Sequence, residues 1–439
     1  MPDQCDVVVI GAGLAGIAAA ARLAKARHRV VLLEQRDRIG GAWATRELDG
    51  VTVDTAPPIF SFPAPWRDLF RKSGRALEAE FARSGEELAP APPARHVFAD
   101  GTEFVLPIGR GDQHAAISDR FGHAVADRWR DLLDGLGDVW QALRPLGVEG
   151  ELVGRKQLAR PVRKALLHRR TIVDLATDLD HPHLSAVIND LAYQFGSDPD
   201  RTPAFVAVQL YLDRTFGRWT AGSGTTMINT LQQRLELRRV EIRTDTRAIR
   251  IGTDPLSVTT DRGVVTARAV VATCDPHQLY RELLPRSAGA AERRRVGRLR
   301  PALSPAVGLA WAERNTDADP VADPVADPVA GAPGDPTETV RHRPAAAPTI
   351  SYTRPVDGRT LEVTYDYGAG RPDPAAGLAW NGFRSWLDRP PTSSAVPGLF
   401  TAGPAGRSGP GASQQILSGA LAAYATQRLI APDHPLEPR

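Results

Sequence analysis

The chain has 439 residues, of which 42% are hydrophobic and 24% are charged, and its formal net charge is only +3. This composition is typical of a globular protein with two domains, or one large domain with an insertion, and it gives no general affinity for nucleic acid. The two cysteines, Cys5 and Cys274, are too few and too far apart for a disulfide framework or a cysteine-rich metal site.

The start of the chain and its hydropathy indicate where the protein resides. A β-branched run begins at Asp6, so we expect no signal peptide. No stretch reaches the roughly 18 apolar residues of a membrane span. We therefore expect a cytoplasmic protein with reduced thiols.

Residues 5–41 predict a strand, a turn, a helix and a second strand. Asp6–Ile10 is a short run typical of a buried parallel strand, and the Ala-rich segment after it predicts a helix to about Ala26. The second strand, Val30–Leu33, ends at Glu34. This order of elements is that of a dinucleotide-binding unit.

Three glycines in the spacing G-x-G-x-x-G occupy the turn. Gly11 permits the tight turn, Gly13 lets a pyrophosphate approach the backbone, and Gly16 lets the helix pack closely on the strand. The helix N-terminus offers free N–H groups to the phosphates, and Glu34 can accept hydrogen bonds from the ribose hydroxyls. A carboxylate there disfavours the 2′-phosphate of NADP. A glycine-rich packing turn is the alternative, which the order of elements disfavours.

The segment RDRIGGAW, residues 36–43, indicates which of two cofactors, FAD or NAD, this site binds. The first motif alone is compatible with either dinucleotide. Gly40 and Gly41 indicate a second close approach of the backbone to the same cofactor, which favours FAD.

The next part of the chain is helical by its pattern. Residues 127–143 and 182–193 place apolar side chains at helical spacing, which more often marks a core face than a cofactor contact. Between them, residues 154–170 are basic with apolar residues at helical spacing, interrupted by Pro161. Such a segment can associate weakly with an anionic membrane surface, although a solvated helix face is the commoner explanation.

Residues 319–330 read DPVADPVADPVA, a repeat whose prolines exclude a helix interior and a sheet ladder. We expect a flexible, exposed insertion over about 319–348 without a catalytic role, with partner binding as the alternative. Thr349–Tyr352 and Thr360–Tyr367 then predict two strands joined by the hairpin segment RPVDGR.

Residues 398–415, GLFTAGPAGRSGPGASQQ, form a glycine-rich bend between an apolar strand and a predicted helix, Ile416–Leu429. Gly409 and Gly411 let the backbone approach a planar ring closely. The helix can direct its N-terminus at a reduced flavin, which carries negative charge. A surface loop before a terminal helix is the alternative.

Together these motifs resemble the FAD-dependent phytoene desaturase-like flavoproteins, within the amine oxidase and carotenoid desaturase superfamily that also includes the Rab escort fold. The likeness is carried by GGAWATRELDGVTVDTAPPIF (40–60), the block at 193–251, ARAVVATCDPHQLYRELLP (267–285) and the bend at 398–423.

The resemblance implies an α/β fold with two domains. The first is a discontinuous Rossmann-type FAD-binding domain, and the second is an α+β substrate domain. We expect the FAD-binding domain at residues 1–75, 220–290 and 395–439, and the substrate domain at 76–219 and 291–394.

The resemblance also implies which residues contact FAD. In this family the C-terminal bend lies against the flavin, and we expect a strand at Thr246–Ile251 beside the adenine. The GSGTT turn, residues 222–226, should approach the ring from the other side. The expected cofactor-binding residues are Gly11, Gly13, Ala15, Gly16, Glu34, Gln35, Gly40, Gly41, Ala42, Trp43, Ala248, Gly403, Gly411, Ala412 and Ser413.

The chemistry is assigned to the flavin, because the sequence has no catalytic cysteine, no H-E-x-x-H motif and no metal-spaced cluster, so no metal is expected. No catalytic base stands out. Candidates for polar roles are Arg407, Ser408, Ser413, Gln414 and Arg214. Further candidates for the cavity lining are Asp213, Tyr193, Tyr211, Trp43 and Trp219.

Three functions fit these motifs. The first is FAD-dependent desaturation or oxidation of an apolar or polyene-like small molecule by a biosynthetic tailoring enzyme. The second is a redox-neutral isomerase or cyclase that uses bound reduced FAD, and the third is a flavin-less escort-type binding protein. The intact set of Gly11, Gly13, Gly16 and Glu34 disfavours the third. The sequence does not separate the first two, and we take the first as the main hypothesis.

Overall fold

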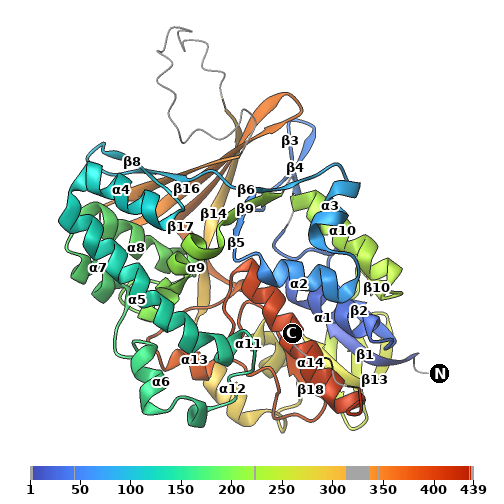
Figure 1. Ribbon diagram of the computed structural model, residues 1–439. Coiled ribbons are helices and arrows are strands. Elements are labelled where there is room, and N and C mark those ends of the chain that lie inside the picture. Colours follow the sequence, from blue (N-terminus) through green and yellow to red (C-terminus); the bar gives the residue numbers. More distant parts are fainter. Residues whose placement is uncertain are drawn as a thin grey trace.

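The computed structural model describes residues 3–43, 45–221, 224–312, 336–344, 346–434 and 436. The proline repeat at 319–330 lies outside these residues, so its exposure and flexibility remain predictions. Figure 1 places α1, α14, β1 and β13 in the lower right and the helices α4, α5, α7 and α8 at the left.

The elements have the following bounds. The strands are β1 (Asp3–Ile10), β2 (Val30–Leu33), β3 (Thr45–Leu48), β4 (Val51–Asp54), β5 (Ile59–Ser61), β6 (Leu88–Pro90), β7 (Ala94–Val97), β8 (Glu103–Leu106), β9 (Arg218–Ala221), β10 (Glu241–Arg243), β11 (Ala248–Thr253), β12 (Leu256–Thr260), β13 (Gly263–Ala272), β14 (Pro301–Trp311), β15 (Thr337–Arg343), β16 (Ala346–Val356), β17 (Arg359–Leu378) and β18 (Leu399–Thr401). The helices are α1 (Leu14–Lys25), α2 (Ala64–Ser73), α3 (Leu77–Arg83), α4 (Arg110–Phe121), α5 (His123–Gly147), α6 (Arg160–Ala165), α7 (Ile172–Leu179), α8 (Pro182–Gln194), α9 (Val208–Phe216), α10 (Gly224–Leu237), α11 (Pro276–Gln278), α12 (Ala290–Val296), α13 (Ser385–Asp388) and α14 (Ala412–Ile430).

Parallel pairing organises the larger sheet. Its strand order is β10-β2-β1-β13-β12-β11 with β18 beside β13, and β10, β2, β1, β13 and β18 run parallel. Leu33, Ile10, Ala272 and Thr401 form one row across their carboxyl ends. Four segments of the chain therefore leave the sheet at the same edge, where open α/β sheets bind their ligands.

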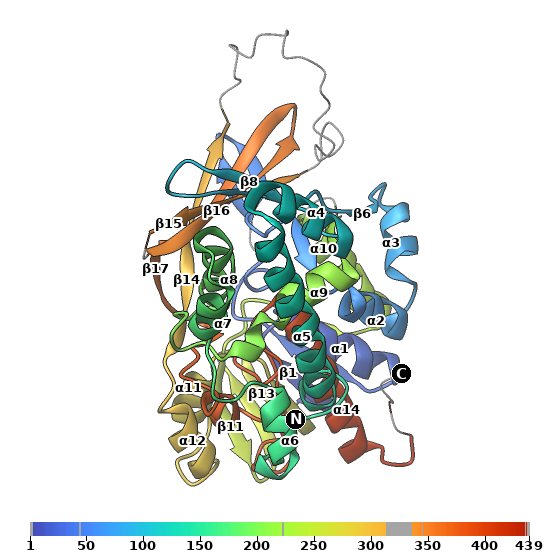
Figure 2. The same cartoon turned by 60° about the vertical axis from the view of Figure 1, so that its left-hand side comes forward.

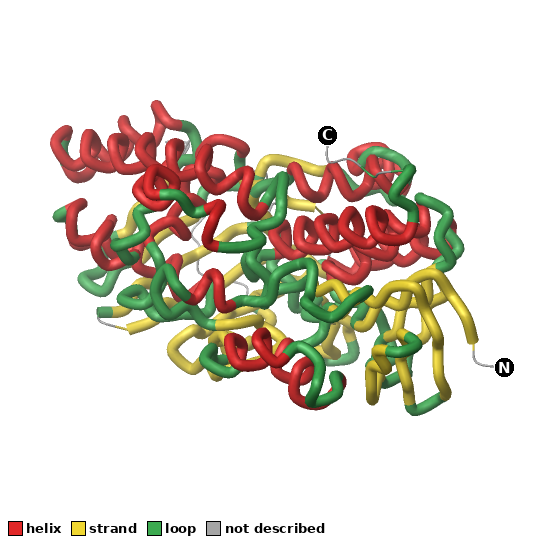
Figure 3. The backbone as a smooth tube through the Cα atoms, turned by 90° about the horizontal axis from the view of Figure 1, so that it is seen from below, coloured by secondary structure: helices red, strands yellow, loops and turns green. Residues whose placement is uncertain are grey.

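Side chains of β1 alternate between two apolar layers, because successive strand residues point to opposite faces. Val7 and Val9 pack in the core that contains α1 and α14, whereas Val8 and Ile10 belong to the core on the other face. Figure 3, a view from below, shows helices along one side of the sheet that carries the N-terminus.

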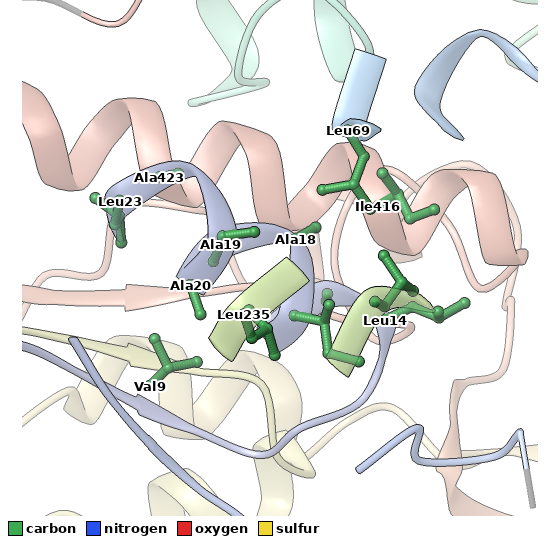
Figure 4. Close-up of a cluster of buried hydrophobic side chains, with 14 of the residues drawn as sticks. Val9, Leu14, Ala18, Ala19, Ala20, Leu23, Leu69, Leu235, Ile416 and Ala423 are labelled. Carbon is green, nitrogen blue, oxygen red and sulfur yellow. The ribbon is translucent and has the colours of Figure 1, made fainter. Parts of the chain in front are cut away.

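The helices α1 and α14 approach each other closely. Figure 4 shows Ala18, Ala19 and Ala20 in their shared core, with Ala423 contributed by α14. A Cβ added at Gly419 of α14 would lie 2.2 Å from the carbonyl oxygen of Ala15. This helix contact therefore requires glycine at position 419.

The second large sheet has the order β14-β17-β16-β15-β7-β8 and is antiparallel except where β15 pairs with β7. The helix α8 packs against β15 and β16. Trp129, Leu133 and Trp386 are buried in the core of the surrounding helices, and Figure 2 shows α5 running from α4 toward α6. The two sheets with their helices confirm the predicted fold class, while the domain limits remain a prediction.

Most predicted elements are present, with shifted ends. The helices predicted at 127–143 and 182–193 lie within α5 and α8, and β16 and β17 form the predicted hairpin, with Val356 opposite Arg359.

Two local predictions are wrong. Residues 337–343 and 346–348 are not a flexible insertion but form β15 and the start of β16, because alternate residues of β15 are buried. Pro161 does not interrupt a helix; it lies in the first turn of α6, where a missing N–H costs nothing. Of the predicted GSGTT turn, residues 224–226 form the first turn of α10, and its approach to the flavin ring remains a prediction.

We predict that Gly419→Ala lowers the unfolding free energy by about 1–3 kcal/mol, the typical cost of overpacking a core. Gly135→Ala is the matched control, since a Cβ at this position of α5 meets nothing within 4 Å. Better helix propensity should then stabilise the control by about 0.5–1 kcal/mol. Thermal unfolding of both variants measures the difference, and a Gly419→Ala variant that melts at or above the wild-type temperature contradicts the packing described here.

Candidate cofactor site and adjoining cavities

The turn after β1 is packed too tightly for side chains. Gly11 has a φ of +97°, and a Cβ at Gly16 would lie 1.9 Å from the carbonyl oxygen of Gly11. The turn at Gly40 and Gly41 lies directly beside it, because a Cβ at Gly41 would come within 2.9 Å of the Gly13 Cα. The two glycine segments that the sequence predicts to approach one cofactor are thus neighbours, and Gly13 and Gly41 are partly exposed.

Glu34 is held at the end of β2 by backbone donors. The N–H of Ala12 donates to Oε2 at 2.8 Å and the N–H of Arg36 donates to Oε1 at 2.9 Å, and the residue is buried. Thr246 N also donates to the backbone carbonyl of Glu34 at 2.8 Å, which places the segment before β11 and Ala248 beside the end of β2. Gln35 is exposed.

The C-terminal bend meets the N-terminal turn at Thr273. Its hydroxyl donates to the carbonyls of Ile10 (2.9 Å) and Gly11 (3.0 Å). Gly403, with a φ of +117°, packs on the other side, and a Cβ there would lie 3.4 Å from the Thr273 carbonyl oxygen. Sequence reasoning did not select Thr273, although it follows a buried strand directly.

Both helices that begin at this edge lack a side-chain cap. Gly13 is the N-cap of α1 and Gly411 is the N-cap of α14, and neither helix receives a capping hydrogen bond from a side chain there. Ala15 lies in the first turn of α1 and Ala412 begins α14. Uncapped N-termini leave N–H groups available to an anionic group. With the bare glycine backbone and the buried Glu34, these residues fit a dinucleotide such as FAD.

Two aromatic rings pack together next to the turn at Gly40 and Gly41. Trp43 packs on Trp66 with ring centroids 5.3 Å apart, and the N–H of Gly40 donates to the Ala12 carbonyl at 2.8 Å. Ala42, which precedes Trp43 in the chain, is exposed.

Several candidates for polar roles are bound to the protein itself. Arg407 donates to four backbone carbonyls, those of Leu152, Val153, Leu387 and Arg389. Burial lowers its pKa to about 10. These contacts support a structural role for Arg407 rather than one at the ring. Ser408 likewise donates to the carbonyl of Gly147 at 3.0 Å.

Ser413 and Gln414 anchor the first turn of α14. The Ser413 hydroxyl donates to the carbonyl of Ser61 at 2.8 Å and lies 2.9 Å from that of Phe62. The Gln414 amide donates to Gln209 Oε1 at 3.4 Å. Both side chains therefore fix the position of the helix N-terminus against β5 and α9.

Two cavities are lined in part by α9, and one of them also includes residues of this bend. The smaller, of about 50 Å³, is mainly apolar, is walled by Phe195, Phe205 and Trp380, and includes Gly409 and Gln414 of the bend. The larger, of about 100 Å³, lies among α5, α8, α9, β7 and β15 and carries many charged groups. We call them the apolar pocket and the charged cavity.

The charged cavity contains groups that sequence reasoning missed. His342 Nδ1 lies 2.6 Å from Asp190 Oδ2, and its Nε2 lies 2.9 Å from His96 Nδ1. Burial raises the pKa of Asp190 and lowers that of His96 to about 3. Arg218 pairs with Glu338; burial opposes its charge, but Glu338 and Asp213 outweigh burial and raise its pKa.

Of the predicted lining residues, Asp213 and Arg214 do line the charged cavity. Arg214 pairs with Asp134 at 2.7 Å. Trp219 instead stacks under Arg67 with 5.0 Å to the ring centroid, and Tyr211 packs on α5 at Gly137. Tyr193 belongs to neither cavity lining.

Within the part of the chain that the structure describes, the His, Cys, Asp and Glu side chains do not gather in groups of three or more that could hold a metal ion. None of the described helices combines the length and apolar character needed to cross a bilayer.

Known proteins similar to this chain include a dehydrogenase and a desaturase. Phytoene dehydrogenase of Streptomyces griseus is 29% identical over 286 residues, which cover 63% of this chain and 55% of that protein. Hydroxyneurosporene desaturase of Rhodobacter capsulatus is 28% identical over 241 residues, which cover 51% and 46%. The chain therefore spans about half the length of the curated relatives it matches.

Solved structures show the same fold. Putrescine oxidase bound to putrescine aligns with a TM-score of 0.68 and 14% identity, over 98% of this chain and 100% of that one.

The sequence model of one protein family, the flavin containing amine oxidoreductases, matches residues 14–376, from the start of α1 into β17. The predicted cofactor, FAD, is confirmed by these matches. Because the matched residues make up most of the chain, this protein belongs to the flavin containing amine oxidoreductase family.

Proposed function

We propose that this protein is an FAD-dependent oxidoreductase that desaturates an apolar or polyene-like small molecule, as a biosynthetic tailoring enzyme. The observation that carries the proposal is the apolar pocket, whose walls include both Phe205 and Trp380 and the glycine bend itself. An apolar substrate in this pocket would lie beside the bend that we assign to the flavin ring.

The chain's own residues would hold the cofactor in an extended form. The N-terminus of α1, with Gly13, would receive the pyrophosphate, and Glu34 and Ala248 would receive the ribose and adenine. The N-terminus of α14 would face the ring. When bound, FAD supplies a hydride acceptor. The aromatic walls of the apolar pocket would orient the substrate and exclude water from it.

The relatives support dehydrogenation over the two alternatives. Both curated relatives described above are named for dehydrogenation or desaturation. No described contact favours a redox-neutral isomerase or cyclase, and the intact cofactor site speaks against a flavin-less escort protein.

The basic segment has little apolar surface for a membrane. Leu158 and Leu166 are buried, and Val162 packs on the helical core, so α6 presents its basic residues but few apolar ones. Weak association with an anionic surface through charge alone remains our prediction. A cytoplasmic location and the division into two domains also remain predictions.

Anaerobic incubation with phytoene in detergent micelles tests the proposed function. We expect the flavin absorbance to bleach and the product to contain a further carbon–carbon double bond. Micelles without phytoene are the control. Conversion of phytoene to an isomer without bleaching would support the isomerase instead, and an unchanged flavin and substrate would contradict the polyene assignment.

Glu34→Gln should weaken FAD binding about tenfold. The substitution keeps the size and one acceptor oxygen but removes the charge, and hydrogen bonds to charged groups exceed neutral ones by roughly 1–1.5 kcal/mol. Fluorescence titration of the flavin-depleted protein measures the dissociation constant, with Glu282→Gln at an exposed position as the control. Equal affinities in the two variants would show that Glu34 is not the ribose ligand.

Gly411→Val should damage flavin chemistry more than stability. The atoms closest to an added Cβ belong to the flexible side chain of Gln414, the nearest being Oε1 at 2.3 Å, so the fold can accommodate valine. A displacement of about an ångström at the ring can cost on the order of a hundredfold in rate. We expect a lower flavin reduction potential or partial flavin loss with a near wild-type melting temperature. Unchanged spectrum, potential and turnover would mean that the bend is only a surface loop.

A further inference from the structure

Asp213 differs from the other charged groups of the charged cavity because it lacks an ionic partner. Arg214 pairs with Asp134, Arg218 pairs with Glu338, and His342 lies against Asp190. Among the described residues, no cationic nitrogen lies within ion-pair distance of the Asp213 carboxyl. Its donors are neutral: Gln209 Nε2 at 2.7 Å and the hydroxyl of Ser61.

The position of Asp213 links the cavity to the cofactor site. Gln209, its donor, lines the apolar pocket and accepts from Gln414 in the first turn of α14. Ser61, its second donor, provides the carbonyl that anchors Ser413. Asp213 therefore lines the charged cavity, while its donor Gln209 lines the apolar pocket. Gln209 and Gln414 connect Asp213 by hydrogen bonds to the helix end that we assign to the flavin.

We propose that Asp213 is the proton acceptor of the desaturation reaction. This inference rests on the proposed function. The substrate would extend from the apolar pocket past Gln209 to the charged cavity, where Asp213 lies. One substrate carbon there gives a hydride to FAD, and the adjacent carbon gives its proton to the Asp213 carboxylate. The electron pair left by that second C–H bond forms the new carbon–carbon double bond. Bound FAD would supply the acceptor for the two electrons of the hydride, and the proton would remain on Asp213 until water removes it.

The surroundings of Asp213 are suited to this task. Burial raises the pKa of Asp213, and of the charges that face it, Arg218 from β9 lowers the pKa while Glu338 from β15 raises it. Arg214 on the same helix is engaged by Asp134. A carboxylate with a raised pKa is a better base than an exposed aspartate, and a positioned base typically contributes 10²–10⁴-fold in rate.

The first test needs no substrate. Because folding raises the pKa of Asp213, its carboxyl destabilises the folded state increasingly as pH rises above the ordinary aspartate value of 3.8. The melting temperature of flavin-loaded Asp213→Asn should therefore rise relative to wild type between pH 4 and pH 8. Asp138→Asn, an exposed position on α5, should show a constant difference. A constant difference for Asp213→Asn as well would overturn the proposal.

The second test uses phytoene as the probe under anaerobic conditions. Asp213→Asn should still bind phytoene, seen as a perturbed flavin spectrum, but should reduce its flavin at least about a hundredfold more slowly than wild type. Asp213→Glu should recover part of the rate, and Asp138→Asn should match wild type. A wild-type rate in Asp213→Asn overturns the proposal. A wild-type protein that phytoene does not reduce counts against the proposed substrate instead, and the melting measurement still decides the state of Asp213.

Discussion

The parallel placement of β13 between β1 and β18 is the constraint on which the rest of the structure depends. It brings Ile10, Ala272 and Thr401 into one row, so segments far apart in the sequence leave the sheet together. Thr273 then contacts the Gly11 turn directly and the Gly403 bend by packing. Neither glycine segment alone would make a site for a molecule as long as FAD.

The close packing of α1 and α14 also fixes the part of the site that we assign to the flavin ring. Since Gly419 lets α14 approach α1, the uncapped N-termini of both helices open at one edge of the sheet. Ser413 fixes the start of α14 against β5, and Gln414 connects it to α9. The substrate-side cavities thus meet the cofactor site through fixed hydrogen bonds, which is what precise orientation of a reacting group requires.

Local sequence patterns predicted the N-terminal unit well, because the glycine spacing and Glu34 act within one short stretch of chain. The charged cavity could not be predicted in this way. Glu338 and His342 come from β15, which follows a proline repeat, and their burial depends on pairing with β7 and β16. For Arg407 the local pattern was misleading. Its position in the bend predicted a role beside the flavin ring, but its guanidinium donates to backbone carbonyls from distant segments.

The most direct test of this account is the identity of the flavin released from the purified protein by heat. Chromatography of the supernatant should yield FAD, close to one molecule per chain, because only a dinucleotide reaches from Glu34 to the start of α14. Recovery of FMN, or a colourless protein that added FAD cannot reconstitute, would contradict the assignment of both glycine segments to one cofactor.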